Sequence, residues 1–202
     1  GKNNMPHSGD HDIDLNKLRF SNTKLYGRRS ELSRLTDICA GLTDESCPKP
    51  PEMVVISGQS GTGKTAIANQ LREPVKMKGG YFISGKFDIS QRIEPYTALV
   101  EAFTELSDMI TSDIRALFRL KVGIQNAVGT QGEALTDVIP ALRRIINREG
   151  DIANVSLMKA GNRFKYVLRN FVRAICSPSH PVVLFLDDLQ WADPASLEVV
   201  RT

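Results

Sequence analysis

The stretch Gly58-Gln59-Ser60-Gly61-Thr62-Gly63-Lys64-Thr65 decides the fold of this 202-residue chain. It fits the pattern G-x-x-x-x-G-K-[ST], in which a glycine-rich turn joins a strand to a helix. The sequence on either side supplies that context: the apolar, β-branched run MVVIS at 53–57 precedes the turn, and we expect a helix from Lys64. Such runs are typical of buried parallel strands. The pattern therefore predicts an α/β fold of the P-loop type, a parallel sheet flanked by helices.

Each part of this turn suits the binding of phosphate groups, so all its residues are candidate binding residues. Glycine lets the backbone curl until successive N–H groups point at phosphate oxygens, and the positive end of the helix dipole faces the same place. Lys64 is expected to reach the β- and γ-phosphates as a point charge, and Thr65 to place its hydroxyl on Mg²⁺. The alternative is a Gly- and Ser-rich surface turn, which arises by composition on the order of once in a hundred chains of this length.

Paired aspartates follow another apolar run near the end of the chain. Residues 182–186 lead directly into Asp187 and Asp188. Ligands of open α/β sheets bind at the carboxyl ends of the strands, so this edge should face the phosphates. A P-loop site needs a carboxylate for Mg²⁺, and we assign it to Asp187, directly or through a ligated water. Asp188 and Lys64 are the candidate catalytic residues, and Asp188 is expected to orient or deprotonate the attacking water. A strand followed by an acidic turn is the alternative.

Further strands and helices alternate along the chain, which indicates a parallel sheet wrapped by helices. Residues 1–24 are polar with little periodicity, and we interpret them as a flexible tail or linker. Apolar spacing predicts a helix from about Arg29, which the proline-rich stretch at 47–51 ends. The other expected elements are strands at 81–84 and 181–186 and helices over about 99–110, 113–122, 133–148 and 164–175.

Composition places the chain among ordinary globular proteins, with 41% hydrophobic and 24% charged residues. No apolar run approaches the ~20 residues that span a bilayer, and no charged-then-apolar leader opens the chain. We therefore expect neither a membrane partner nor secretion. Three scattered cysteines (Cys39, Cys47 and Cys176), with no CxxC pair, favour a reducing, cytoplasmic compartment. His7 and His11 lie in the polar tail and are not expected to bind a metal.

The charge pattern argues against nucleic acid as a main partner. A net charge of +3 is small for a nucleic-acid-binding protein. Lys165, Arg169 and Arg173 are spaced i, i+4, i+8 opposite an apolar stripe, which predicts the solvated face of an amphipathic helix. A nucleic-acid footprint on these residues is the open alternative.

Together these motifs resemble the AAA-like predicted ATPase domain of the STAND group of signalling NTPases. The most distinctive stretch is VLFLDDLQWADP at 183–194, because its Gln190-Trp191-Ala192-Asp193 tail is typical of this group and not of P-loop proteins at large. The likeness runs from about residue 25 to 201. Its other stretches are LYGR at 25–28 with Glu31 and Leu32, the loop at 58–65, and YFISGKFD at 81–88 leading to Pro95-Tyr96.

The resemblance implies ATP rather than GTP, and no Asn-Lys-x-Asp guanine motif appears in the sequence. It also implies that Tyr26, Gly27 and Arg28 lie near the adenine, although Arg28 is alternatively a solvated charge at a helix start. Trp191 is interpreted as a packing or partner contact. In the family, a strand that follows the aspartates inserts between the strands at 53–57 and 182–187. We therefore expect residues 25–202 to be an incomplete domain, truncated after the strand at 182–187 (the Walker B strand) and its following helix. Between that strand and the one at 53–57 we expect a gap or a non-native pairing.

The expected function is ATP-Mg²⁺ binding and, in the full-length protein, ATP hydrolysis by a nucleotide-dependent switch in a multidomain signalling protein. One alternative is a DNA-loading ATPase of the origin-recognition type, which a winged helix and a clustered basic surface would support. The other is a scaffold that binds ATP without turnover. The expected partners are ATP and effector or sensor domains of the same polypeptide, with a homo-oligomer as an open alternative.

Overall fold

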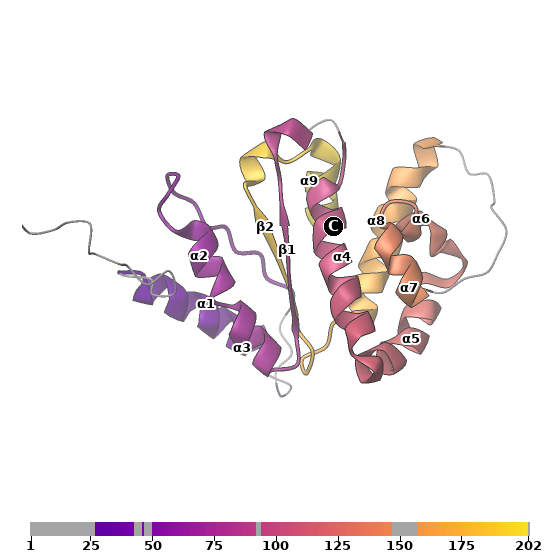
Figure 1. Ribbon diagram of the computed structural model, residues 1–202, viewed down its shortest axis with the longest axis horizontal. Helices are drawn as coiled ribbons and strands as arrows, with labels where there is room; N and C mark the ends of the chain where they lie inside the picture. Colours follow the sequence, from indigo (N-terminus) through magenta and orange to yellow (C-terminus); the bar gives the residue numbers. More distant parts are fainter. Residues whose placement is uncertain (1–26, 43–45, 47–49, 92–93, 147–156, 202) are drawn as a thin grey trace, which may run out of the picture.

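The structure is a computed structural model that describes residues 27–42, 46, 50–91, 94–146 and 157–201. At its centre a two-stranded parallel sheet carries helices on both faces (Figure 1). The expected α/β class with a parallel sheet is confirmed. The elements in chain order are α1 (Arg29–Leu42), α2 (Lys64–Asn69), α3 (Arg72–Met77), β1 (Tyr81–Lys86), η2 (Ile89–Gln91), α4 (Thr97–Ser112), α5 (Ile114–Val128), η3 (Gly129–Gln131), α6 (Glu133–Thr136), η4 (Pro140–Leu142), α7 (Arg143–Ile146), α8 (Leu157–Ile175), β2 (Val182–Asp187), η5 (Leu189–Trp191) and α9 (Pro194–Val200).

The two strands pair in parallel and in a register that aligns their ends. Tyr81 lies opposite Val182, and Lys86 lies opposite Asp187. A last backbone hydrogen bond from the Phe87 N–H to the Asp187 carbonyl, at 3.1 Å, closes the ladder. The carboxyl ends of both strands are therefore level, and their polar terminal residues are neighbours.

The outer edge of β1 is closed by two carboxylates of α4. Alternate N–H groups of a strand point to opposite edges, so those of Ser84 and Lys86 face away from β2. The Ser84 N–H donates to Glu105 at 2.8 Å, and the Lys86 N–H donates to Glu101 at 2.9 Å. Glu101 and Glu105 are one helical turn apart, which matches the spacing of these two donors. Both donors are satisfied, so this edge is a poor template for a further strand.

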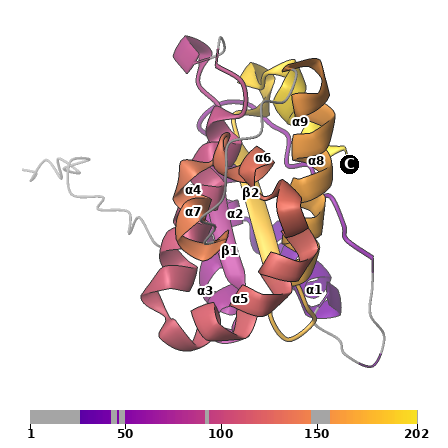
Figure 2. The same cartoon turned by 90° about the vertical axis from the view of Figure 1, so that its right-hand side faces the viewer.

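Side chains of β1 alternate between two hydrophobic clusters, as the period of a strand requires. Tyr81 and Ile83 enter the larger cluster, together with α4, α5 and α8. Phe82 enters the smaller cluster, with residues of α1, α2 and α3. Figure 2 looks onto the helical layer that covers the larger cluster. The sheet is thus the boundary between two cores, and both must pack for β1 to be buried.

Gly85 allows α4 to lie directly against β1. A Cβ atom built on Gly85 would lie 1.9 Å from the carbonyl oxygen of Ala98. Both residues are buried. No side chain other than hydrogen fits between the strand and the start of this helix.

The expected strand at 53–57 is wrong in this structure. Residues 53–57 belong to no ladder, and Met53, Val54 and Val55 are 67%, 45% and 74% exposed. Ile56 packs against the smaller cluster. A strand forms only beside a neighbour that satisfies its N–H and C=O groups, and within the described residues no strand lies beside this run. Residues 53–57 and β2 do not pair with each other there, and an inserted strand between them stays a prediction.

The helices largely follow the expected spacings. The first expected helix is α1, and α4, α5 and α8 cover three of the other expected segments. The described part of the expected segment, residues 133–146, divides into α6, η4 and α7, because Pro140 lacks the N–H that would continue a helix. Within the described residues, no helix combines the length and apolar character that crossing a bilayer requires. The predicted tail at 1–24 lies outside the described residues.

Substituting Gly85 with alanine should destabilise the domain. The added methyl must displace the α4 backbone, and overpacking of this kind costs ~1–3 kcal/mol. Gly123→Ala is the matched control, because a Cβ atom there meets nothing within 4 Å and alanine favours the helix by ~0.5–1 kcal/mol. Urea denaturation followed by far-UV circular dichroism measures both. If the urea midpoint of Gly85→Ala were at or above that of the parent protein, the close approach of α4 to β1 would be contradicted.

Candidate functional site

The phosphate loop at 58–65 is an exposed turn that leads into α2, which begins at Lys64 as expected. Gly58, Gly61 and Gly63 have φ angles of 154°, 78° and 84°, values that favour glycine. A Cβ atom on Gly61 would meet no atom within 4 Å. The loop therefore has the glycine-dependent curl that the motif predicts, and a ligand can approach its backbone from outside.

Lys64 folds back over this loop. Its Nζ donates to the carbonyl oxygens of Gly58 and Gln59, both at 2.9 Å. The Thr62 hydroxyl donates to the same Gln59 carbonyl at 2.8 Å. Carbonyl oxygens are weaker partners for an ammonium group than charged oxygens are. The Lys64 charge is thus held at the loop by contacts that a phosphate can replace.

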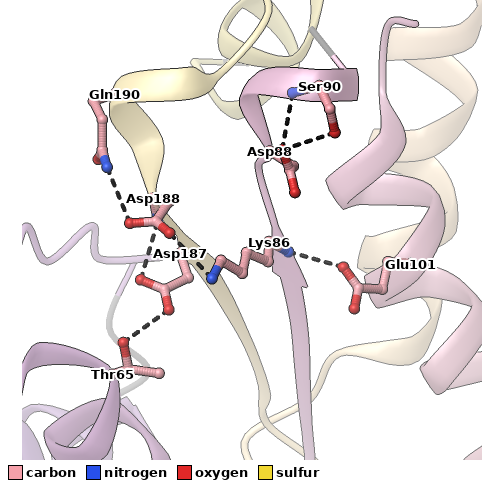
Figure 3. Close-up of polar contacts among 8 residues, drawn as sticks. All are labelled: Thr65, Lys86, Asp88, Ser90, Glu101, Asp187, Asp188 and Gln190. Atoms are coloured by element: carbon pink, nitrogen blue, oxygen red, sulfur yellow. Dashed lines mark hydrogen bonds and ion pairs between the residues drawn. The ribbon is translucent and has the colours of Figure 1, made fainter.

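Thr65 and Asp187, separated by 122 residues, meet at the carboxyl end of β2. The Thr65 hydroxyl donates to Oδ2 of Asp187 at 2.8 Å (Figure 3). Hydroxyl and carboxylate oxygens are the hard ligands that Mg²⁺ takes, usually beside waters and phosphate oxygens. Among the described residues no group of three or more His, Cys, Asp or Glu side chains gathers to hold a metal alone. The pair therefore fits a magnesium ion shared with a phosphate ligand.

Asp188 turns away from Thr65 and towards β1. Its φ of 53° and ψ of 44° lie in the left-handed region, which aspartate tolerates better than most residues. Its N–H donates to Asp187 at 3.0 Å, while its carboxylate accepts from the Gln190 amide at 3.0 Å and pairs with Lys86 at 3.3 Å (Figure 3). The Gln190 hydrogen bond above all, with help from the Lys86 ammonium, lowers the pKa of Asp188 against a smaller opposing effect of desolvation. Asp188 is therefore a weakly basic, ionised carboxylate.

Sequence reasoning did not single out Lys86 or Gln190 as site residues. Lys86 ends the strand beside β2, and the rule that ligands bind at carboxyl ends would have found it had the strand order been known. Gln190 was noted as part of the family's tail and not for its contact with a carboxylate. Asp88, only two residues after Lys86, takes no part, because its carboxylate accepts the Ser90 N–H and hydroxyl at 2.8 and 2.9 Å (Figure 3).

Arg28 links the start of α1 to the phosphate loop. One guanidinium nitrogen donates to the Thr62 carbonyl at 3.2 Å, and another lies 2.8 Å from Glu31. The Arg28 hydrogen bond is the main cause that lowers the pKa of Glu31 to about 2. Arg28 is therefore not simply a solvated charge. Gly27 is exposed, and Tyr26 lies outside the described residues, so contact of all three with adenine stays a prediction.

The tail after the aspartates is a structural element. Asp193 is buried and begins α9, accepting the Ser196 N–H at 2.8 Å and its hydroxyl at 2.6 Å. The same carboxylate accepts the Tyr96 N–H at 3.3 Å, which joins α9 to the start of α4. Trp191 packs against the cluster around Phe87, in agreement with the predicted packing role.

The basic residues of α8 do not form one solvated face. Lys165 is 18% exposed and lies 2.5 Å from Glu198 of α9. The expectation of a solvated face is wrong for Lys165, because a neighbouring helix supplies a carboxylate. Arg169 and Arg173 are exposed as expected.

A hollow of about 460 Å³ lies at the amino end of β1, away from the phosphate loop. Its lining includes Lys76 of α3, Arg119 of α5 and His180, which precedes β2. Glu73 and Asp113 also line it, so its charge is mixed. The nucleotide motifs meet at the opposite ends of the strands, on an open surface.

Comparison with known proteins places these motifs in a family. A family model described as an AAA ATPase domain matches residues 24–202. The chain is 32% identical over 194 residues to a protein named hybrid signal transduction histidine kinase G from Dictyostelium discoideum. That match covers 96% of this chain and 5% of the relative, so the chain spans a small part of the relative's length. No solved structure gives a significant match.

Removing the partners of Asp188 should raise its pKa towards the ordinary aspartate value. We expect Gln190→Ala and Lys86→Met each to raise it, and Lys76→Met, at the other end of β1, to leave it unchanged. A depressed pKa stabilises the fold above the ordinary aspartate range and loses that effect as pH falls through the depressed value. Gln190→Ala and Lys86→Met should therefore each lower the stability of the fold at neutral pH. The stability of these two variants should also depend less on pH in the acid range. Carbon NMR titration of the Asp188 carboxyl measures the pKa, and unchanged values would refute these contacts.

Proposed function

This chain belongs to the AAA ATPase domain family, and we propose that it binds ATP with Mg²⁺ between the phosphate loop and the carboxyl end of β2. In the full-length protein the proposed reaction is ATP hydrolysis, which resets a nucleotide-dependent switch of the STAND type in a multidomain signalling protein. The Dictyostelium relative is named as a signal transduction histidine kinase, which supports a signalling setting.

The observation that carries this proposal is the contact between Thr65 and Asp187. The two side chains come from motifs 122 residues apart and lie 2.8 Å from each other. We assign them as the protein ligands of Mg²⁺, Asp187 directly or through water. These two side chains would hold Mg²⁺ beside the phosphates, where the ion would supply positive charge that offsets the charge of the phosphate oxygens.

Lys64 and the loop backbone are proposed to hold the phosphates. The Lys64 ammonium exchanges its bonds to the Gly58 and Gln59 carbonyls for bonds to charged phosphate oxygens, which are stronger acceptors. The open side of Gly61 leaves room for the phosphate chain beside the N–H groups. We further propose that Tyr26, Gly27 and Arg28 lie near the adenine; the hydrogen bond from Arg28 to the Thr62 carbonyl joins this segment to the phosphate loop.

Asp188 is proposed to orient the attacking water rather than to remove its proton. A general base works best when its pKa lies near the operating pH, and the contacts with Gln190 and Lys86 lower the pKa of Asp188. An ionised carboxylate still accepts a hydrogen bond from water and aligns it for attack on the γ-phosphorus. The bond from the γ-phosphorus to the bridging oxygen then breaks, giving ADP and phosphate, and the proton of the water passes to the phosphate or to solvent.

Two other functions remain as alternatives. A DNA-loading ATPase would need a clustered basic surface, and α8 does not supply one through Lys165, which is paired with Glu198. A binding-only scaffold would hold ATP in the same contacts without turnover. Phosphate release by the full-length protein, measured with and without Mg²⁺, separates the scaffold from the switch.

Lys64→Ala should weaken ATP binding by at least about tenfold, because a hydrogen bond to a charged group contributes ~1.5–3 kcal/mol. Lys76→Ala, on the exposed surface of α3, is the matched control and should bind as the parent protein does. Isothermal titration calorimetry with ATP and Mg²⁺ gives both affinities. Equal affinity of the Lys64 variant and the parent would remove the phosphate role of this residue.

Asp187→Asn and Asp188→Asn should separate binding from turnover. We expect Asp187→Asn to impair Mg²⁺-dependent binding and turnover together, because it changes a metal ligand. Asp188→Asn should lose turnover and largely keep binding, because it acts on the water and not on the ground-state complex. Asp88→Asn is the control, since that carboxylate is occupied by Ser90. The same loss of binding in both variants would contradict the division of roles.

A further inference from the structure

Helix α5 exposes an apolar stripe that the fold does not use. Ile114, Phe118 and Val122 are 67%, 72% and 64% exposed. Their spacing of four residues places them in one row of about 12 Å along the helix. The opposite side of α5 supplies the buried residues Ala116, Leu120, Ile124 and Val128 and packs mainly against α8. Exposed apolar rows of this kind mark interaction sites more often than single exposed residues do.

Positive side chains border the stripe on both sides. At 100° per residue, Arg115 and Arg119 lie on one flank and Lys121 on the other. Helix α5 contains no Asp or Glu. Across the described part of the chain, none of these three cations forms an ion pair with a carboxylate, and Arg119 contacts the His180 ring nitrogen at 2.6 Å. The nearby carboxylate of Asp113 is occupied by the backbone N–H groups that begin the helix.

We propose that this face of α5 is a docking surface for an acidic amphipathic helix of a protein partner. The apolar side chains of the partner helix, spaced i, i+3 or i+4, and i+7, would cover Ile114, Phe118 and Val122. Its flanking carboxylates would lie against Arg115, Arg119 and Lys121. In Figure 1, α5 lies beyond α4 from the phosphate loop, so the surface is separate from the nucleotide site. The proposal does not depend on ATP binding.

The charge pattern selects this occupant over three others. A second copy would bring the cations of two α5 helices together, and like charges across an interface oppose docking. Single-stranded nucleic acid binds by stacking on aromatic faces, and two of the three apolar residues, Ile114 and Val122, have none. Helices that lie on bilayers present a broad apolar face that is free to insert, whereas α5 is packed on its other side and offers only a narrow row.

A synthetic peptide tests the surface on the full-length protein. The probe is a fluorescein-labelled helical peptide of about 20 residues, with leucine at the anchor positions, glutamate at the positions that flank them and alanine elsewhere. Its binding is followed by anisotropy. We expect Phe118→Ser to weaken binding by at least about tenfold, as for a central anchor. Met77→Ser removes an 86%-exposed apolar side chain of α3 and should have no effect. Equal binding by the Phe118 variant and the parent would overturn the proposal.

A charge swap tests the border separately. The double variant Arg115→Glu/Arg119→Glu should bind the acidic peptide about tenfold more weakly or worse. It should bind a peptide in which lysine replaces glutamate more tightly than the parent protein does. Arg34→Glu, an exposed change on α1, is the control and should do neither. All these substitutions are at exposed positions, and circular dichroism verifies that the variants fold. The proposal would be refuted if the parent protein bound the lysine peptide, anionic vesicles or single-stranded DNA more tightly than the acidic peptide. Self-association that Phe118→Ser abolishes would also refute it.

Discussion

The parallel pairing of β1 with β2 is the constraint on which the site depends. In its register Lys86 lies beside Asp187, so the polar residues that end the two strands gather at one edge. The same pairing leaves the alternate N–H groups of β1 without a strand partner, and Glu101 and Glu105 of α4 satisfy two of them. A buried strand cannot leave such donors unpaired without a cost of ~1–3 kcal/mol each. The position of α4 and the position of the site are therefore fixed by one set of backbone requirements.

The sequence was informative where a residue's role depends on its near neighbours. The phosphate loop, the start of α1 and α2, and the strands that became β1 and β2 all follow from local patterns of glycine, apolar period and β-branched residues. The convergence of Thr65 and Asp187 could also be predicted, because the motif fixes one residue at a helix start and the strand rule fixes the other at a sheet edge. Neither inference requires knowledge of which strands are adjacent.

Sequence reasoning failed where adjacency decides the outcome. Residues 53–57 have the composition of a strand, but composition supplies no hydrogen-bonding neighbour, and Met53 and Val55 are exposed. The contact of Lys86 with Asp188 was not predicted, because no residue near Lys86 in the sequence shows that β2 lies beside β1. The pattern of its own helix predicts that Lys165 is a solvated charge. Glu198 lies against it only because of the position of α9. Each error concerns a contact between segments that are distant in the sequence.

A nucleotide switch needs contacts that differ between its states, because a ligand shifts an equilibrium only by its difference in affinity for the two states. In the described structure, Lys64 and Lys86 make contacts that a bound nucleotide could replace. Lys64 rests on two loop carbonyls, and Lys86 rests on Asp188, so each charge is held by an acceptor of the protein. A triphosphate carries several charged oxygens, and in the proposed complex it would compete for Lys64 and Lys86 at once. Moving Lys86 towards phosphate would free Asp188 from one of its two partners, while its backbone stays bound to Glu101 of α4. If Asp188 orients the water as proposed, the Lys86 side chain would couple nucleotide occupancy to the state of that carboxylate.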